Sequence, residues 1–176
     1  ATLQKPKLLL LDEHTAALDP KTAAKVMEDV RDLNLRVMRV LNEGGLPSAS
    51  LPPSAVATLR SGKLDVLDVD LFRRYLEIGI SPVTFGDVAL DSERRFGICS
   101  GDQLMERLAK ELRPEKVIFV SDVDGVFTAD PSRDPGATLM EVVDRATLDS
   151  LPRTQRCADV TGSIFGKIET MLRIAS

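Results

Sequence analysis

The sequence predicts an α/β fold in which helices cover a largely parallel sheet. Segments with strand-like and helix-like patterns alternate along the chain, as expected when strands are joined by crossover helices. The strand-like runs are short and apolar, which is typical of buried strands. With 176 residues, the chain is long enough to form one sizeable hydrophobic core.

Two strands and a long helix are expected first. The fully apolar run over residues 8–11 predicts a buried strand. Asp19 and Pro20 then supply a cap and a first-turn proline for a helix over about 21–42, which Gly44-Gly45 ends. The apolar face of this helix is expected to hold Val26, Val30, Leu33, Val37, Met38 and Leu41. The next elements are a strand over 46–51 that ends at Pro52-Pro53, a helix over 69–78 and a strand over 80–85.

A hairpin is expected near the middle of the chain. Residues 88–90 and 96–99 flank the polar sequence DSERR, which predicts two strands joined by a turn. Ser100 or Gly101 then starts a helix that runs to Leu112. The remaining elements are a buried strand over 116–121, the clearest of the chain, a short helix over 146–151 and a last helix over about 162–175.

The composition of the chain argues against several classes of function. Hydrophobic residues make up 43% of the chain and charged residues 28%, which is ordinary for a soluble globular protein. The net charge of -4 argues against a nucleic-acid surface, because such a surface needs clustered Lys and Arg. No apolar run approaches the roughly 20 residues that span a bilayer, and no signal-peptide layout is present. Cys99 and Cys157 suggest neither a disulfide framework nor a zinc site, so we expect buried thiols in a cytoplasmic protein.

Residues 5–28 resemble the Walker B strand and D-loop of ABC-type ATPases. The resemblance rests on LLLLDE over residues 8–13 and TAALDP over residues 15–20. It implies that Asp12 holds Mg²⁺ through water and that Glu13 polarises the attacking water. The chain contains no G-x-x-x-x-G-K-[ST] phosphate loop and no LSGGQ-like signature. We therefore expect two acids at the exposed end of a buried strand, with an ABC-type ATPase fragment as an alternative.

Two glycine-bearing loops predict a nucleotide site. In VIFVSDVDGVFTADP, residues 117–131, Gly125 permits a sharp turn, and Asp122 and Asp124 follow a strand at the end where open α/β sheets bind ligands. In DVTGSIFGK, Gly162 permits a close backbone approach, and Lys167 on the following helix can reach the β- and γ-phosphates. The alternatives are a solvated acidic turn and an ordinary exposed lysine.

The SGDQL sequence predicts an anion site. Ser100-Gly101 precede a helix whose first-turn N–H groups are unpaired donors. Asp102 could instead act only as the helix cap.

Residues 30–176 resemble the amino acid kinase superfamily, most closely its isopentenyl phosphate kinases. The resemblance rests on LNLRVMRVLNEGGLPSASLPPSAV, ISPVTFGDVALDSERRFGICSGDQL, VIFVSDVDGVFTADPSRDP and DVTGSIFGKIETML, in the family's order. It implies a three-layer αβα sandwich with a mostly parallel sheet, lacking the family's N-terminal strands and last strands. It also implies transfer of the γ-phosphoryl group of ATP to a small-molecule phosphate such as isopentenyl phosphate, with Mg²⁺ carried by ATP and no metal site of the protein's own.

The same resemblance assigns residue roles. Lys167 and Asp102 would be catalytic, the lysine at the phosphates and the aspartate orienting the lysines that neutralise the transferring group. The residues implied to border ATP are Ser121, Asp122, Asp124, Gly125, Phe127, Asp130, Pro131, Gly162 and Lys167. Those implied to border the acceptor are Ser100, Gly101, Gly86 and Asp87. The helix over Leu33–Leu41 and the turn Pro52-Pro53-Ser54 would line the acceptor's isoprenoid pocket.

The sequence also departs from the family pattern. No Lys-x-Gly-Gly strand is present, and the one histidine, His14, lies in the ABC-like stretch rather than at the end of a glycine-rich loop. We therefore expect an ABC-like strand and helix start over 1–29, packed onto a partial kinase-like domain over 30–176, with nucleotide binding but little turnover. A non-catalytic nucleotide-binding or dimerising fragment or chimera is the alternative, and a homodimer is possible by resemblance.

Overall fold

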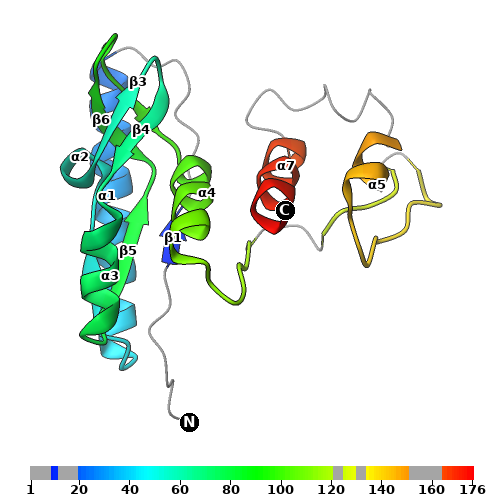
Figure 1. The fold of residues 1–176 in the computed structure, drawn as a ribbon, viewed down its shortest axis with the longest axis horizontal. Coiled ribbons are helices and arrows are strands. Elements are labelled where there is room, and N and C mark those ends of the chain that lie inside the picture. Colours follow the sequence, from blue (N-terminus) through cyan, green and yellow to red (C-terminus); the bar gives the residue numbers. More distant parts are fainter. Residues whose placement is uncertain (1–8, 12–19, 121–124, 130–133, 151–163) are drawn as a thin grey trace. The chain divides into compact units, whose positions relative to one another are not determined.

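The computed structural model describes residues 9–11, 20–120, 125–129, 134–150 and 164–176. The chain divides into two units, Ala1–Arg113 and Pro114–Ser176, and each is described by itself (Figure 1). Among the described residues, unit 1 contains both sheets, and unit 2 contains two helices and a short bridge between extended segments.

A three-stranded parallel sheet lies at the centre of unit 1. Its order is β1 (Leu9–Leu11), β5 (Ser81–Phe85) and β2 (Ser48–Ser50), with β5 in the middle. Leu11 pairs with Phe85, and Ser50 pairs with Val83. All five residues of β5 are buried, as expected for a strand that has strands on both sides and helices on both faces. The carboxyl ends of the three strands therefore meet at one edge of the sheet.

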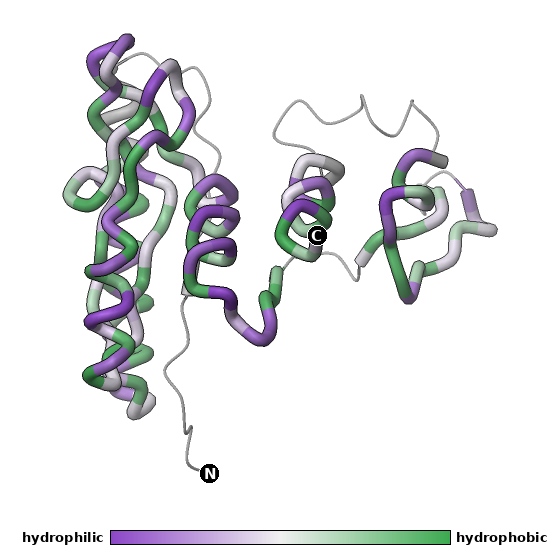
Figure 2. The backbone as a smooth tube through the Cα atoms, viewed as in Figure 1, coloured by the Kyte–Doolittle hydropathy of each residue, from purple (hydrophilic) through white to green (hydrophobic). Residues whose placement is uncertain are grey.

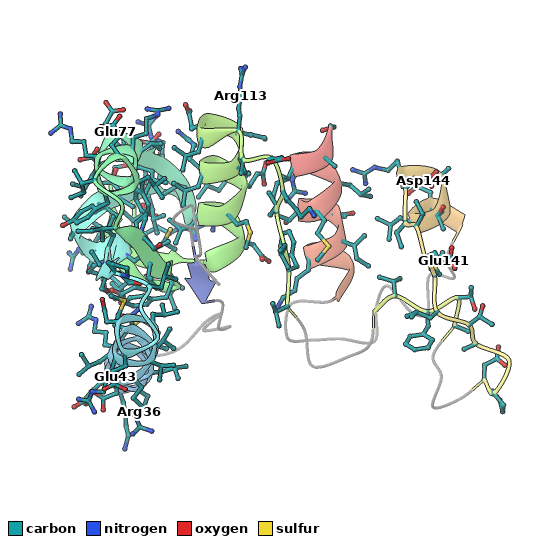
Figure 3. The ribbon with its side chains drawn as sticks, turned by 90° about the horizontal axis from the view of Figure 1, so that it is seen from below. Arg36, Glu43, Glu77, Arg113, Glu141 and Asp144 are labelled. Carbon is teal, nitrogen blue, oxygen red and sulfur yellow. The ribbon has the colours of Figure 1, made fainter. Side chains whose placement is uncertain are left out.

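Helices cover both faces of this sheet. Phe85 packs against Met27 and Val30 of α1 (Pro20–Glu43). On the other face lie α3 (Val69–Glu77) and α4 (Gly101–Leu112), whose apolar residues share one core cluster. Figure 3 shows α1, with Arg36 and Glu43, on the side of the strands opposite to α3 and α4. Helix α3 alternates hydrophilic and hydrophobic residues in Figure 2, as an amphipathic helix does. The predicted αβα layering is confirmed.

A second, four-stranded sheet adjoins the first in sequence. Its order is β4 (Lys63–Leu67), β3 (Ala57–Arg60), β6 (Asp87–Asp91) and β7 (Arg95–Cys99). The pairs β3–β4 and β6–β7 are antiparallel hairpins, and a parallel pairing of β3 with β6 joins them. The four-residue helix α2 (Pro53–Val56) precedes β3. The predicted hairpin around DSERR is therefore confirmed.

The β3–β4 hairpin was not predicted from the sequence. Its turn residues Ser61 and Gly62 have φ values of 52° and 80°, which two-residue hairpin turns of type I′ require. Ser61-Gly62 between two runs of partly alternating apolar residues was the available signal. The pattern is weakened because the register of the pairing shifts between Thr58 and Leu59.

The Asp91 carboxylate joins the turns of the two hairpins. It accepts backbone N–H bonds from Ser61 at 3.1 Å, Gly62 at 2.6 Å, and Glu93 and Arg94 at 2.9 Å each. Burial raises the pKa of Asp91, but the four N–H donors outweigh it and lower the pKa to about 2. A fixed negative charge thus holds both turns.

The substitution Asp91→Asn should destabilise unit 1 in a pH-dependent way. Because the folded-state pKa lies below the unfolded value of about 3.9, the charge contributes stability above that pH and loses it as pH falls towards 2. Urea unfolding of both proteins between pH 5 and 2 should give a stability difference that shrinks as pH falls. A difference that stays constant across this range would contradict the role assigned to the charge.

Unit 2 contains α5 (Arg145–Ser150), α7 (Ile164–Ala175) and an antiparallel bridge between Phe127 and Leu139. Its core joins Leu148 of α5 to Ile168 of α7. Partly buried apolar residues surround this pair: Val126, Met140, Val143 and Leu172. Both helices agree with the predicted positions, although residues 151, 162 and 163 lie outside the described part of the chain.

The predicted strand over 116–121 is wrong for the residues that the structure describes. Residues 116–120 form no strand, and Ile118 and Val120 are 66% and 90% exposed. An extended segment becomes a strand only when a neighbour pairs with its N–H and C=O groups, and no described segment does so here. An apolar run alone therefore could not decide this element.

The predicted boundary between residues 29 and 30 falls within a helix. Helix α1 runs without interruption from Pro20 to Glu43, and β1 pairs with β5. The division of the chain at this point stays a prediction.

Candidate active site

The four residues predicted to border the acceptor are brought to one corner of unit 1. Gly86 and Asp87 follow β5 at the carboxyl edge of the parallel sheet. Asp87 is paired in register with Cys99, so Ser100 and Gly101 follow directly beside it. We name Gly86, Asp87, Ser100 and Gly101 the acceptor corner. Open α/β sheets bind ligands at such an edge.

The Asp87 side chain is bonded within the protein. It is wholly buried, and Nη2 of Arg31 lies 3.1 Å and 3.0 Å from its two carboxylate oxygens. Ser54 Oγ donates a hydrogen bond of 3.1 Å, and the backbone N–H of Val88 donates one of 2.8 Å. Asp87 therefore ties α1 and α2 to the start of β6, and we name this set the Asp87 clasp.

Cys99 lies beside the clasp and is fully buried. Burial, together with the negative charge of Asp87, raises the pKa of its thiol to about 12. The thiol is therefore neutral at physiological pH. The prediction of a buried cysteine is confirmed for Cys99, whereas Cys157 lies outside the described residues.

The first turn of α4 completes the corner. Ser100 is the N-cap, and its hydroxyl accepts the N–H of Gln103 at 3.4 Å. Asp102 is the second helical residue and is partly buried, so the capping role considered for it belongs to Ser100. The N-terminus of a twelve-residue helix carries partial positive charge, which suits a phosphate or carboxylate ligand.

Part of the predicted nucleotide loop lies in the described residues of unit 2. Gly125 has a φ of +147°, and a Cβ atom there would lie 3.0 Å from Cδ1 of Leu139. The position therefore favours glycine for both backbone and packing reasons, which agrees with the predicted sharp turn. Phe127 is partly buried and forms the bridge to Leu139. Six other predicted nucleotide residues lie outside the described part of the chain: Ser121, Asp122, Asp124, Asp130, Pro131 and Gly162.

Lys167 lies in the first turn of α7 and is partly buried. Its neighbour Ile168 is buried in the core of unit 2, so the backbone at this position is anchored. Asp102 belongs to unit 1 and Lys167 to unit 2. The predicted cooperation of their charges stays a prediction.

The long helix α1 departs from its predicted apolar face. Leu33 is 41% exposed, and Asn34 is buried in its place. Asn34 Oδ1 accepts a hydrogen bond of 2.7 Å from Ser50 Oγ in β2. The buried side of the helix includes Val30 and Met27, which lie one and two turns before Asn34. The prediction that residues 33–41 line an isoprenoid pocket stays a prediction.

Sequence reasoning missed Arg31. A buried carboxylate requires a partner, but Arg31 precedes Asp87 by 56 positions and looks like any exposed arginine of an amphipathic helix. No local pattern could have joined the two residues.

Two further observations concern metals and membranes. Among the residues that the structure describes, no group of three or more His, Cys, Asp or Glu side chains could hold a metal ion. None of the described helices combines the length and the apolar character needed to cross a bilayer.

Comparison with known proteins identifies the family. The model of the amino acid kinase family matches residues 6–176. This chain belongs to the amino acid kinase family. It is 43% identical over 149 residues to isopentenyl phosphate kinase from Methanothermobacter thermautotrophicus. The matched stretch covers 83% of this chain and 56% of that protein. It is 36% identical over 151 residues to isopentenyl phosphate kinase from Thermoplasma acidophilum, covering 86% and 58%.

A less similar relative is named after an acceptor other than isopentenyl phosphate. Glutamate 5-kinase 1 from Mesorhizobium japonicum is 34% identical over 104 residues, which covers 52% of this chain and 27% of that protein. The chain spans a little over half the length of the two isopentenyl phosphate kinases that it matches.

Solved structures of the family agree with the fold. A crystal structure of the isopentenyl phosphate kinase substrate complex matches with a TM-score of 0.66 and 30% identity, covering 89% of this chain and 60% of that one. The amino acid kinase-like α/β fold predicted from the sequence is confirmed. The family match also includes most of the segment that resembles ABC-type ATPases, whose Asp12 and Glu13 lie outside the described residues.

Proposed function

We propose that this family member takes part in the ATP-dependent phosphorylation of isopentenyl phosphate to isopentenyl diphosphate. The observation that carries the proposal is the 43% identity to an isopentenyl phosphate kinase over 149 residues, which is 83% of this chain. In this reaction the bond from the γ-phosphorus of ATP to its bridging oxygen breaks. A phosphate oxygen of the acceptor bonds to that phosphorus, and ADP leaves.

The acceptor corner supports the proposal on the side of unit 1. The backbone at Ser100 and Gly101 opens a twelve-residue helix, where N–H donors and the helix dipole favour a phosphate. Because Asp87 is wholly buried, its role would be to hold the corner rather than to touch the acceptor. Asp102, in the same first turn, would orient the cations that neutralise the transferring group.

Lys167 and the glycine-bearing loops support the proposal on the side of unit 2. A lysine in the first turn of an anchored helix can neutralise the β- and γ-phosphates as a compact charge. Gly125 and Phe127 would border the nucleoside with the other predicted loop residues. Mg²⁺ would arrive with the phosphates of ATP, and its charge would add to that of Lys167.

We also propose that residues 1–176 alone turn over substrate slowly. They contain neither a Lys-x-Gly-Gly segment nor a glycine-rich loop that ends in histidine. Phosphoryl transfer depends on positioning and charge neutralisation, and each lost donor typically raises the barrier by roughly 2.7–4 kcal/mol.

A panel of acceptors tests the proposed substrate. With Mg-ATP, we expect isopentenyl phosphate to be converted to its diphosphate, detected by ³¹P NMR, whereas glutamate, aspartate, carbamate and uridine monophosphate give no phosphorylated product. Where conversion is slow, calorimetric titration should still detect binding of isopentenyl phosphate. Preferential transfer to any other member of the panel would refute the assignment.

A further inference from the structure

Gln103 occupies an unusual position at the start of α4. The sequence Ser100-x-x-Gln103 has the spacing of a capping box, in which the glutamine side chain would return to the N–H of the cap residue. The first half of the box is present, because Ser100 Oγ accepts the N–H of Gln103 at 3.4 Å. The glutamine side chain, however, bonds to the β3–β4 hairpin: its Oε1 accepts the N–H of Leu64 at 2.6 Å, and its Nε2 lies 3.5 Å from the carbonyl oxygen of Gly62.

The hairpin turn is therefore held from two sides. Asp91 of β6 accepts the N–H groups of Ser61 and Gly62, and Gln103 of α4 bonds to the carbonyl of Gly62 and the N–H of Leu64. Ser61 Oγ also donates a hydrogen bond to Glu93. Of these contacts, only those of Gln103 link the turn to a helix.

Gln103 lies at the end of α4 that contributes Ser100 and Gly101 to the acceptor corner. Gln103 lies two residues after Gly101 and one after Asp102, in the same helical turn. A displacement of the β3–β4 turn would therefore pull directly on the backbone that carries the predicted phosphate donors. One turn further along, Arg107 Nη2 lies 3.4 Å from the carbonyl oxygen of Asp65, a contact to the same strand that does not involve the first turn.

We propose that Gln103 is a positioning residue that couples the β3–β4 hairpin to the acceptor corner. It keeps the first turn of α4 in its binding geometry only while the hairpin turn is in place. Binding of the acceptor phosphate to Ser100 and Gly101 should in return stabilise the hairpin, because coupling between two sites is reciprocal. The part that concerns the acceptor rests on the proposed function.

Amide hydrogen exchange and acceptor titration test this coupling in the whole chain. In Gln103→Ala, the Leu64 amide should exchange about three- to tenfold faster, as expected for loss of one hydrogen bond. The affinity for isopentenyl phosphate, measured by calorimetry, should fall by about the same factor, while the affinity for Mg-ATP is unchanged. Gln103→Glu retains an acceptor oxygen for the N–H of Leu64, so it should restore most of the protection of that amide.

Arg107→Ala is the matched control, since it removes a contact between the same helix and the same strand. It should leave acceptor affinity unchanged. In the wild type, added isopentenyl phosphate should slow exchange at Leu64, and this protection should be absent in Gln103→Ala.

Four results would overturn the proposal or part of it. An unchanged exchange rate of the Leu64 amide in Gln103→Ala would refute the proposed link between Gln103 and the β3–β4 hairpin. Faster exchange with full acceptor affinity, or an equal loss of affinity in Arg107→Ala, would refute the coupling to the site. If the wild type binds no isopentenyl phosphate, the proposed function and the acceptor part of the coupling fail together, and the exchange data alone decide whether Gln103 ties the hairpin to α4.

Discussion

Replacing Arg31 by alanine should lower the free energy of unfolding by roughly 3 kcal/mol, which corresponds to a fall in Tm of roughly 6–12 °C. The substitution leaves the carboxylate of Asp87, whose side chain is fully buried, without its cation. Removing one partner of a buried ion pair typically costs about 3–5 kcal/mol. We expect the lower end of that range because Arg31 is 53% exposed, so that water can approach the vacated position.

Thermal and urea unfolding check this expectation, with Arg36→Ala as the control. Arg36 is an exposed residue of the same helix, so its loss should change stability by less than about 0.5 kcal/mol. The double variant Arg31→Ala with Asp87→Asn should be less destabilised than the sum of the single variants, since the amide removes the buried charge. Additive effects, or an Arg31→Ala protein as stable as Arg36→Ala, would show that the Asp87 clasp contributes little.

Replacing Lys167 by alanine should weaken the binding of Mg-ATP by roughly 10- to 150-fold. The expected loss is that of a hydrogen bond to a charged group, about 1.5–3 kcal/mol. Ile168 keeps the helix anchored in the core of unit 2, so the variant should stay folded. Calorimetric titration with Mg-ATP measures the effect directly.

Arg173→Ala provides the control for Lys167, since it removes a cation from the last turn of the same helix. It should bind Mg-ATP like the wild type. Equal affinities of the wild type and Lys167→Ala for Mg-ATP would refute the assignment of Lys167 to the nucleotide site. If Glu13→Gln abolished a measurable ATP hydrolysis that Lys167→Ala retained, the ABC-like segment would carry the chemistry instead.

Elements that are defined by local signals could be predicted from the sequence. Helix α1 begins at the predicted proline and ends next to the predicted glycine pair, and β5 and α4 agree with their predicted ranges to within one residue. Caps, prolines and periodicity act within a few residues of each other, so a single sequence contains the information.

Elements and contacts that depend on distant partners could not be predicted. The run over 116–120 has a strand-like composition but no pairing strand among the described residues, so it stays extended and exposed. Asn34 replaces Leu33 on the buried side of α1 because a hydroxyl in β2 bonds to it. The site shows the same division: Ser100 and Gly101 follow from helix-start signals, whereas the partnership of Arg31 with Asp87 does not.

The bonds from Asp91 to the Ser61-Gly62 turn also bear on how the protein matures during synthesis. The carboxylate that completes this turn is encoded 29 to 30 residues after it. At about 5–20 residues per second, translation delivers that side chain some seconds after the turn itself has been made. The β3–β4 hairpin should therefore reach its final form only after β6 has emerged from the ribosome. A nascent chain that stalls before Asp91 should expose this hairpin, without the bonds from Asp91, to chaperones and proteases.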